Sequence, residues 1–276
     1  MLNSGFISFV NSTRRPIRRI GVVLAGVPRV VALLALALLV HAPLGPLPGG
    51  VVPARADEAG VLRLAVVDMA PYGFVNNGEP AGLAFELGAA LAAGAGGEAS
   101  ATLYSRRETL RALAQGEADM AVLPGGPPPG RGVVNAGPLL ESHYAAIARS
   151  GTPLRSRHDL AGKTVAVVRD EPGDPLLSTR HGVALLPVTS LSRGLKLLLA
   201  GKVDAVAAER LALLHAVDAL HLPARALGTL LPLSPVRIDL LLSPSLDPDL
   251  AHRLDETRKL LTEREDFRAI AARYGL

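Results

Sequence analysis

Residues 110–123, LRALAQGEADMAVL, and residues 195–208, LKLLLAGKVDAVAA, share the pattern Leu-x-x-Leu-x-x-Gly-x-x-Asp, with every matched position displaced by 85 residues. In both copies, leucines three residues apart mark one face of a helix, and the glycine permits the left-handed end of that helix. The short apolar run after the aspartate is typical of a buried strand. The chain therefore contains an internal repeat of one helix–strand unit.

The segments around the two copies also match. Residues 62–67 and 164–168 are β-branched apolar runs followed by loops with Pro or Gly, which predicts a strand upstream of each copy. Ser105 with Glu108 forms a predicted capping box at the first helix, and Ser190 is a predicted N-cap of the second. Each half then reads as strand, loop, helix, strand, helix, strand. Such alternation predicts an α/β fold of two lobes, each a mostly parallel sheet flanked by helices.

Two further apolar stretches, 143–149 and 236–242, are predicted to cross between the lobes as hinge strands. Only helical segments follow the second stretch, so the chain is expected to return to the first lobe. The predicted organisation is lobe 1 from residues 57–147, lobe 2 from residues 148–233, and a hinge return with C-terminal helices of lobe 1 from residues 234–276.

Residues 1–56 are predicted to be a cleavable signal peptide. Four arginines lie within residues 14–19, residues 30–40 form an unbroken apolar run, and Ala54-Arg55-Ala56 is a small-x-small cleavage site. The alternative is a permanent membrane anchor, but eleven residues of helix cover only about 16 Å, roughly half a hydrocarbon core. We therefore expect cleavage before Asp57 and a working place in the periplasm.

The leader also explains the basic charge of the chain. Six of the 29 basic residues and none of the 25 acidic residues lie in residues 1–56, so cleavage changes the formal charge from +4 to −2. The charge balance therefore gives no support for nucleic-acid binding. The absence of cysteine excludes a thiol nucleophile, a disulfide and a zinc–thiolate site.

Several segments are similar, in this order and spacing, to one protein family: LRLAV (62–66), APYGF (70–74), Gly82-Leu83 before a helix with Glu86, DLAGKTVAV (159–167) and GKVDAV (201–206). Over essentially its whole mature length the chain resembles the periplasmic solute-binding proteins of ABC transporters, of the amino-acid-binding type (family 3). The resemblance implies a two-lobed type II periplasmic-binding-protein fold with a small solute in the cleft. It also implies an inner-membrane ABC permease as partner, a monomer and no cofactor.

The resemblance implies that Arg131 grips the carboxylate of the solute, because it stands where the family places such an arginine. A guanidinium suits this role because its forked donors pair with both carboxylate oxygens. The alternative is a solvated loop arginine. Residues 126–129, Gly-Pro-Pro-Pro, stand where the family usually offers threonine hydroxyls, and prolines supply no N–H donor. Either capture depends more heavily on Arg131, or the ligand has changed.

Three more residues complete the predicted ligand site. Glu209 stands where the family often has an aspartate that receives the ammonium of the solute, with a surface pair to Arg210 as the alternative. Tyr72 lies in the loop where the family stacks an aromatic ring on the ligand, with packing beneath the loop beside Phe74 as the alternative. Asp68 begins the same loop, at the carboxyl end of the first predicted strand, where ligands of parallel sheets bind.

Four other acidic residues receive structural roles. Asp170 and Glu171 replace a Gly-Thr pair with which the family commonly opens a helix, and we expect them to stabilise a helix start, although they would repel an anionic ligand. Asp119 and Asp204 follow the helix-ending glycines and are predicted to form turns. The histidines are scattered, so no metal site is predicted.

The leading hypothesis is a binding protein that captures a small polar, amino-acid-like solute. The second is a scaffold of the same fold without transport, for example an accessory of a periplasmic dehydrogenase, because the loop 125–130 departs from the family pattern. An enzyme is not predicted, although Glu171 and Glu209 could act as acid and base. A sensor domain is not expected either, because no transmembrane or signalling segment follows Leu276.

Overall fold

The computed structural model describes residues 60–276 except 128–131, 176, 179, 180 and 224. The predicted signal peptide, its cleavage site and Arg131 lie outside the described residues. Among the residues that are described, no helix has the length and apolarity needed to cross a membrane.

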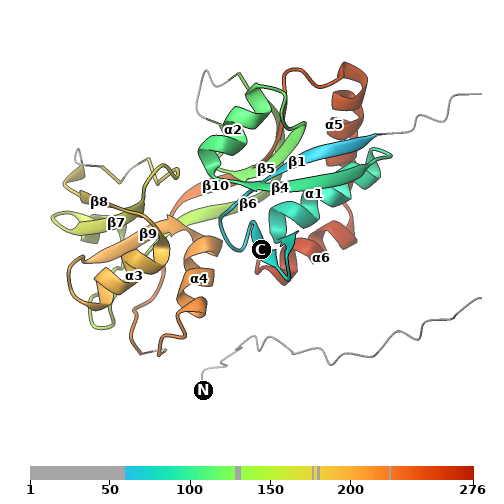
Figure 1. The fold of residues 1–276 in the computed structure, drawn as a ribbon. Coiled ribbons are helices and arrows are strands. Elements are labelled where there is room, and N and C mark those ends of the chain that lie inside the picture. Colours follow the sequence, from blue (N-terminus) through green and yellow to red (C-terminus); the bar gives the residue numbers. More distant parts are fainter. Residues whose placement is uncertain (1–59, 128–131, 176, 179–180, 224) are drawn as a thin grey trace, which may run out of the picture. The chain divides into compact units, whose positions relative to one another are not determined.

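The strands form one large sheet and one small one (Figure 1). The large sheet contains β1 (Val61–Val67), β4 (Glu98–Tyr104), β5 (Met120–Pro124), β6 (Val134–Ala148), β7 (Thr164–Val168), β8 (Ala184–Val188), β9 (Ala205–Glu209) and β10 (Leu231–Leu242). Their order is β4-β1-β5-β10-β6-β9-β7-β8. The small sheet pairs β2 (Phe74–Asn76) with β3 (Glu79–Ala81).

The helices are α1 (Leu83–Gly94), α2 (Arg106–Ala114), α3 (Leu191–Leu199), α4 (Arg210–Ala219), α5 (Pro248–Thr262) and α6 (Glu265–Arg273), with a 3-10 turn at Arg157–Leu160. Both predicted helix starts are confirmed. Ser105 accepts a bond from the backbone N–H of Glu108, whose carboxylate accepts in return from the N–H of Ser105. Ser190 accepts from the N–H of Arg193 at the start of α3.

The parallel strands fall into two groups, as predicted. In the first half of the sheet β1 pairs in parallel with β4 and β5, and in the second half β7 pairs in parallel with β8 and β9. Between them run the two long strands: β10 is antiparallel to β5 and β6, and β6 is antiparallel to β9. Both long strands therefore belong to both halves. The predicted fold class, α/β with two mostly parallel sheets joined by two strands, is confirmed.

One predicted helix is wrong. The second half was expected to have a helix between the strand 164–168 and the repeat, but the described residues of the segment 169–183 contain no α-helix. Pro172 and Pro175 explain this difference, because each disfavours the α region for the residue before it. In this half, part of the sheet packs instead against Leu154 and Leu177 from irregular segments and against Leu160 of the 3-10 turn.

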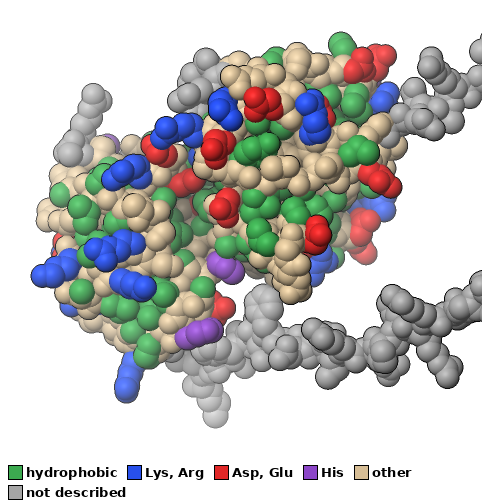
Figure 2. Space-filling view, viewed as in Figure 1, with side chains coloured by type: hydrophobic (Ala, Val, Ile, Leu, Met, Phe, Trp, Pro, Cys, Tyr) green, Lys and Arg blue, Asp and Glu red, His purple; other side chains and the backbone are tan. Residues whose placement is uncertain are grey.

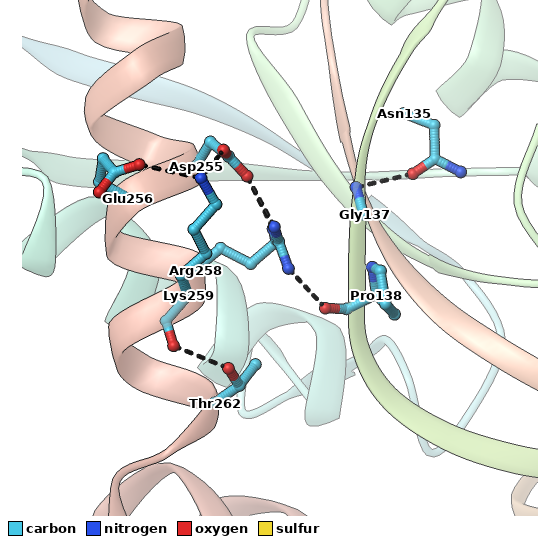
Figure 3. A network of polar contacts seen from close by, with 8 residues as sticks. All are labelled: Asn135, Gly137, Pro138, Asp255, Glu256, Arg258, Lys259 and Thr262. Carbon is cyan, nitrogen blue, oxygen red and sulfur yellow. Dashed lines mark hydrogen bonds and ion pairs between the residues drawn. The ribbon is translucent and has the colours of Figure 1, made fainter.

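Helix α5, the first helix after β10, is fixed to β6 by one arginine (Figure 3). The guanidinium of Arg258 donates to the carbonyl of Pro138 at 3.1 Å and to the carboxylate of Asp255 at 2.8 and 3.0 Å. Gly137 makes room for it: its φ is +120°, and a Cβ atom there would lie 3.1 Å from the Arg258 Cζ. The returning chain is thus tied to the first half of the sheet, because β6 is approached closely at a residue without a side chain.

The charge on the visible surface is mixed. Figure 2 shows acidic and basic side chains interspersed over the part of this face that carries α2, and mainly basic side chains over the part that carries α3. This mixture agrees with a formal charge that is close to zero once the six arginines of residues 1–56 are set aside.

Candidate functional site

A cavity of about 430 Å³ lies where strand ends from both halves of the sheet meet. Its walls include residues 68–70 after β1, Pro124 at the end of β5, residues 171–173 after β7, residues 189–192 at the start of α3, and residues 207–209 at the end of β9. Residues at or just after the ends of β1, β5, β7 and β9 therefore line one cavity. Parallel α/β sheets bind ligands at this edge, because loops and helix starts converge there.

Glu209 lines this cavity and is only 6% exposed. Its side chain caps α4 by accepting from the N–H of Ala212 at 3.1 Å, and its other oxygen accepts from the hydroxyl of Ser142 at 2.5 Å. The alternative of a surface pair with Arg210 is wrong, because Arg210 donates instead to the carbonyl of Gly275. Among the described residues the Glu209 carboxylate makes no ion pair with Lys or Arg, so it is a buried charge held by two neutral donors.

Tyr72 is fully buried and does not line the cavity. Its hydroxyl has no hydrogen-bond partner in the described part of the chain. Burial raises the pKa of Tyr72 well above its ordinary value, and the nearby charge of Glu209 raises it further. This burial favours the alternative role for Tyr72, packing beneath the loop, over stacking on a ligand.

The other two predicted ligand residues have different outcomes. Asp68 lines the cavity with an exposed side chain, and its backbone N–H donates to the carbonyl of Tyr104, which holds the start of the loop against β4. Arg131 lies outside the described residues, so its role as carboxylate partner stays a prediction.

Asp170 and Glu171 do not begin a helix, contrary to expectation. Asp170 has a φ of +64°, and Pro172 follows Glu171 and disfavours the α region for it. The two acids instead reach across to α2 in the first half. Asp170 pairs with Arg107 at 2.7 Å on the surface, and Glu171, which lines the cavity, lies 4.0 Å from Arg106. Both acids therefore join the two halves of the sheet.

Arg106 is a buried residue beside the cavity that the sequence interpretation missed. It is 6% exposed, and its guanidinium donates to the carbonyl of Pro124 at 2.8 Å and to that of Gly126 at 2.7 Å. Burial lowers the pKa of Arg106, and the charge of Glu171 opposes that shift. One signal was present: Arg106 precedes Leu110 by four residues and so shares its buried helix face.

Burial also shifts the pKa of two ionisable groups in the cavity wall. It raises the pKa of Tyr144 to about 12 and raises the pKa of Glu171. The positive charge of Arg106 opposes both shifts. Asp68, Glu171 and Glu209 give the cavity three carboxylates, whereas no Lys or Arg is found among its described lining residues. Within the same described residues no three His, Asp or Glu side chains are grouped to hold a metal ion. The arrangement can therefore bind a small, polar, positively charged group.

Comparison with solved structures identifies the fold of this chain. No protein-family model matches the sequence, and no curated protein matches it. Among solved structures, an ancestral arginine-binding protein bound to arginine matches with a TM-score of 0.66 at 19% identity, over 79% of this chain and 99% of the other. The arginine-, lysine-, histidine-binding protein ArtJ from Geobacillus stearothermophilus matches with a TM-score of 0.64 at 18% identity, over 78% and 95%.

A histidine kinase sensor domain with similarity to periplasmic binding proteins also matches, with a TM-score of 0.61 at 23% identity, over 79% of this chain and 96% of the other. Binding proteins and a sensor domain thus share this architecture. The chain has the periplasmic-binding-protein fold that its sequence resemblance implied.

Proposed function

We propose that this protein, which has the fold of the periplasmic binding proteins, captures a small polar solute in the periplasm and delivers it to an inner-membrane ABC permease. The observation that carries the proposal is the cavity at the strand ends, with the buried carboxylate of Glu209 in its wall. Its volume of about 430 Å³ falls within the usual range for small-molecule sites, roughly 300–1,000 Å³.

In this proposal capture closes two lobes around the solute. Lobe 1 consists of residues 57–147 and 234–276, lobe 2 of residues 148–233, and the strands β6 and β10 act as the hinge. Because the cavity wall takes residues from both halves of the sheet, a solute that touches both halves stabilises only the closed state. Glu209 and Asp68 contact the solute directly, and Tyr72 supports the loop from beneath.

A ligand screen of the exported protein tests this function. The full gene is expressed in a bacterium, and the protein is purified from the periplasm, where its mass should correspond to a chain that begins at Asp57. Thermal unfolding is then followed with amino acids, polyamines and small organic acids. One class should stabilise the protein clearly, by about 2.7 kcal/mol at a ligand concentration 100 times the dissociation constant. A chain that stays in the cytoplasm or retains residues 1–56 would contradict the export prediction.

Arg131 can be tested separately. If it grips a carboxylate of the solute, Arg131→Ala weakens binding by about 2–5 kcal/mol, as for one lost partner of a buried charge pair. Unchanged affinity in calorimetry would reject that role while leaving solute capture intact.

A second candidate function is the scaffold without transport. The observation that favours it is the pairing of Arg106 with Glu171 and of Arg107 with Asp170, because these pairs join the two halves through side chains of the protein itself. A scaffold would show no stabilising ligand anywhere in the screen. A single clear ligand would exclude it in favour of solute capture.

A further inference from the structure

We propose that the cavity selects an organic cation without a carboxylate, such as an alkyl diamine, rather than an α-amino acid. This inference rests on the proposed function and narrows the class of solute that it captures.

The charges of the cavity wall are the first argument. Asp68, Glu171 and Glu209 contribute carboxylates from three different segments, and the described lining residues include no Lys or Arg. His215 also lines the cavity, but its exposed ring stacks on Phe74, with ring centroids 6.4 Å apart. A solute carboxylate placed among like charges is disfavoured, whereas an ammonium or guanidinium group is attracted.

The environment of Glu209 is the second argument. It is a buried carboxylate whose described partners, the Ser142 hydroxyl and the Ala212 N–H, are both neutral. A buried charge is costly unless an opposite charge accompanies it, so this oxygen pair is suited to receive a cationic group from the solute. Ionised carboxylates also form the stronger, charge-assisted class of hydrogen bond with ammonium donors.

The contacts of Arg106 are the third argument. Among the described residues, Arg106 is an arginine beside the cavity, 4.0 Å from Glu171 of the cavity wall. Its NH1 and NH2 atoms already donate to the carbonyls of Pro124 and Gly126. Two of its five N–H donors are therefore taken by backbone carbonyls, and the carboxylate of Glu171 lies beside its charge, so a solute carboxylate would compete with groups of the protein itself.

The rest of the wall indicates the body of the cation. Met69, Val168, Leu191 and Ala212 give the cavity an apolar lining between its carboxylates, which suits an alkyl chain. A metal ion does not fit, since the described His, Asp and Glu side chains form no group of three that could hold one.

Matched pairs of ligands test the inference by calorimetry on the exported protein. The pairs are 1,5-diaminopentane with L-lysine, 1,4-diaminobutane with L-ornithine, and 4-guanidinobutylamine with L-arginine, whose members differ only in the α-carboxylate. In the pair that binds best, the member without the carboxylate should bind at least about tenfold more tightly, and its affinity should fall as salt is added. If the amino acid binds equally or more tightly, or if an anionic solute is the best ligand, the inference is wrong and solute capture stands. If nothing in the panel binds, the inference is wrong, and solute capture is decided by the wider screen of amino acids, polyamines and small organic acids.

Variants locate the effect in the cavity. Glu209→Gln keeps the size of the side chain and should lower the affinity for the best amine by at least about tenfold, because a charge-assisted hydrogen bond is lost. Glu117→Gln is the matched control, since Glu117 is exposed and pairs with Arg111 away from the cavity. Asp68→Asn, at an exposed lining position, gives a second measurement should Glu209→Gln fail to fold. Full affinity in each folded cavity variant would overturn the inference.

Discussion

The two halves of the sheet carry the same local structure. The order β4-β1-β5 in the first half is mirrored by β8-β7-β9 in the second, with β10 and β6 between them. Asp119 accepts from the backbone N–H of Arg63 in β1 and donates its own N–H to the carbonyl of Arg63. Asp204 makes the same two contacts with Thr164 in β7. Each repeated aspartate therefore links the start of its own strand to the neighbouring strand by two hydrogen bonds, and we call this arrangement an aspartate clamp. This role goes beyond the turn that was expected of the two aspartates.

The halves differ in what covers them. In the first half, residues of α1, α2, α5 and α6 join the sheet in one continuous apolar cluster. In the second half the two faces carry separate, smaller clusters, and one face is covered partly by irregular segments. The outer strand β8 is largely exposed, with Leu185 at 39% and Leu186 at 37%. The same helix–strand unit can therefore be supported by quite different amounts of packing.

The largest expected effect comes from truncating the matched leucines. Leu113 and Leu198 are fully buried in corresponding positions of the two copies. Leu113→Ala should lower the free energy of unfolding by about 3–5 kcal/mol and Leu198→Ala by about 2–4 kcal/mol, because a smaller cluster collapses more readily around the void. Urea denaturation measures both values. A greater loss at Leu198 would show that the second half is the more rigidly packed.

The next effect concerns the pairs that join the halves. Arg106→Ala removes a buried guanidinium from two carbonyl oxygens and from Glu171, so it should cost about 2–4 kcal/mol of unfolding free energy. Its neighbour provides the control: Arg107→Ala breaks only an exposed pair with Asp170 and should cost less than about 1 kcal/mol. Equal losses in thermal or urea unfolding would contradict the distinction between buried and exposed contacts.

The aspartate clamps are expected to give a smaller effect. Asp119→Ala and Asp204→Ala each remove the acceptor of a strand N–H, at a cost of about 1–3 kcal/mol. The loss at Asp119 should exceed the other by no more than about 1 kcal/mol, since its extra ion pair is with the exposed guanidinium of Arg63. The two unfolding free energies can be compared directly. A loss at Asp204 that is clearly the larger would show that the clamps are not equivalent.

The smallest effect is a pH dependence of opposite sign in the two halves. Burial raises the pKa of Glu171 above 4.5, so the Glu171 carboxyl holds its proton more tightly in the folded state than in the unfolded state. The stability that Glu171 contributes is therefore present below pH 4.5 and is lost as pH rises through the folded-state pKa. The hydrogen bond from Ser105 lowers the pKa of Glu108 below 4.5, so its contribution is present above that value and is lost as pH falls. Glu171→Gln should therefore gain stability relative to the parent as pH rises, and Glu108→Gln should lose it. Melting temperatures between about pH 2.5 and pH 8 cover both ranges of pH, and equal signs would refute the prediction.

The sequence predicted local structure well where the signal was local. The capping box at Ser105, the N-cap at Ser190 and the strand at 164–168 depend on residues a few positions apart, and all three are confirmed. The helix expected before the second copy was wrong because an analogy with the first half was given more weight than Pro172 and Pro175. At the cavity, Asp68 was predicted from the end of a strand and Glu209 from the family resemblance, whereas Tyr72 could equally stack or pack, and only its burial favours packing.

The sequence by itself determined the repeat, the alternation of strands and helices and the edge of the sheet where a cavity forms, because periodicity and glycine placement are properties of neighbouring residues. Only the tertiary structure decided which charges meet. Arg106 and Glu171 are 65 positions apart in the chain, and no local pattern brings them to the 4.0 Å at which they lie. The same holds for Glu209 and Ser142, which are far apart in the sequence. A buried carboxylate needs a hydrogen-bond donor, and the tertiary structure decides which residue supplies it.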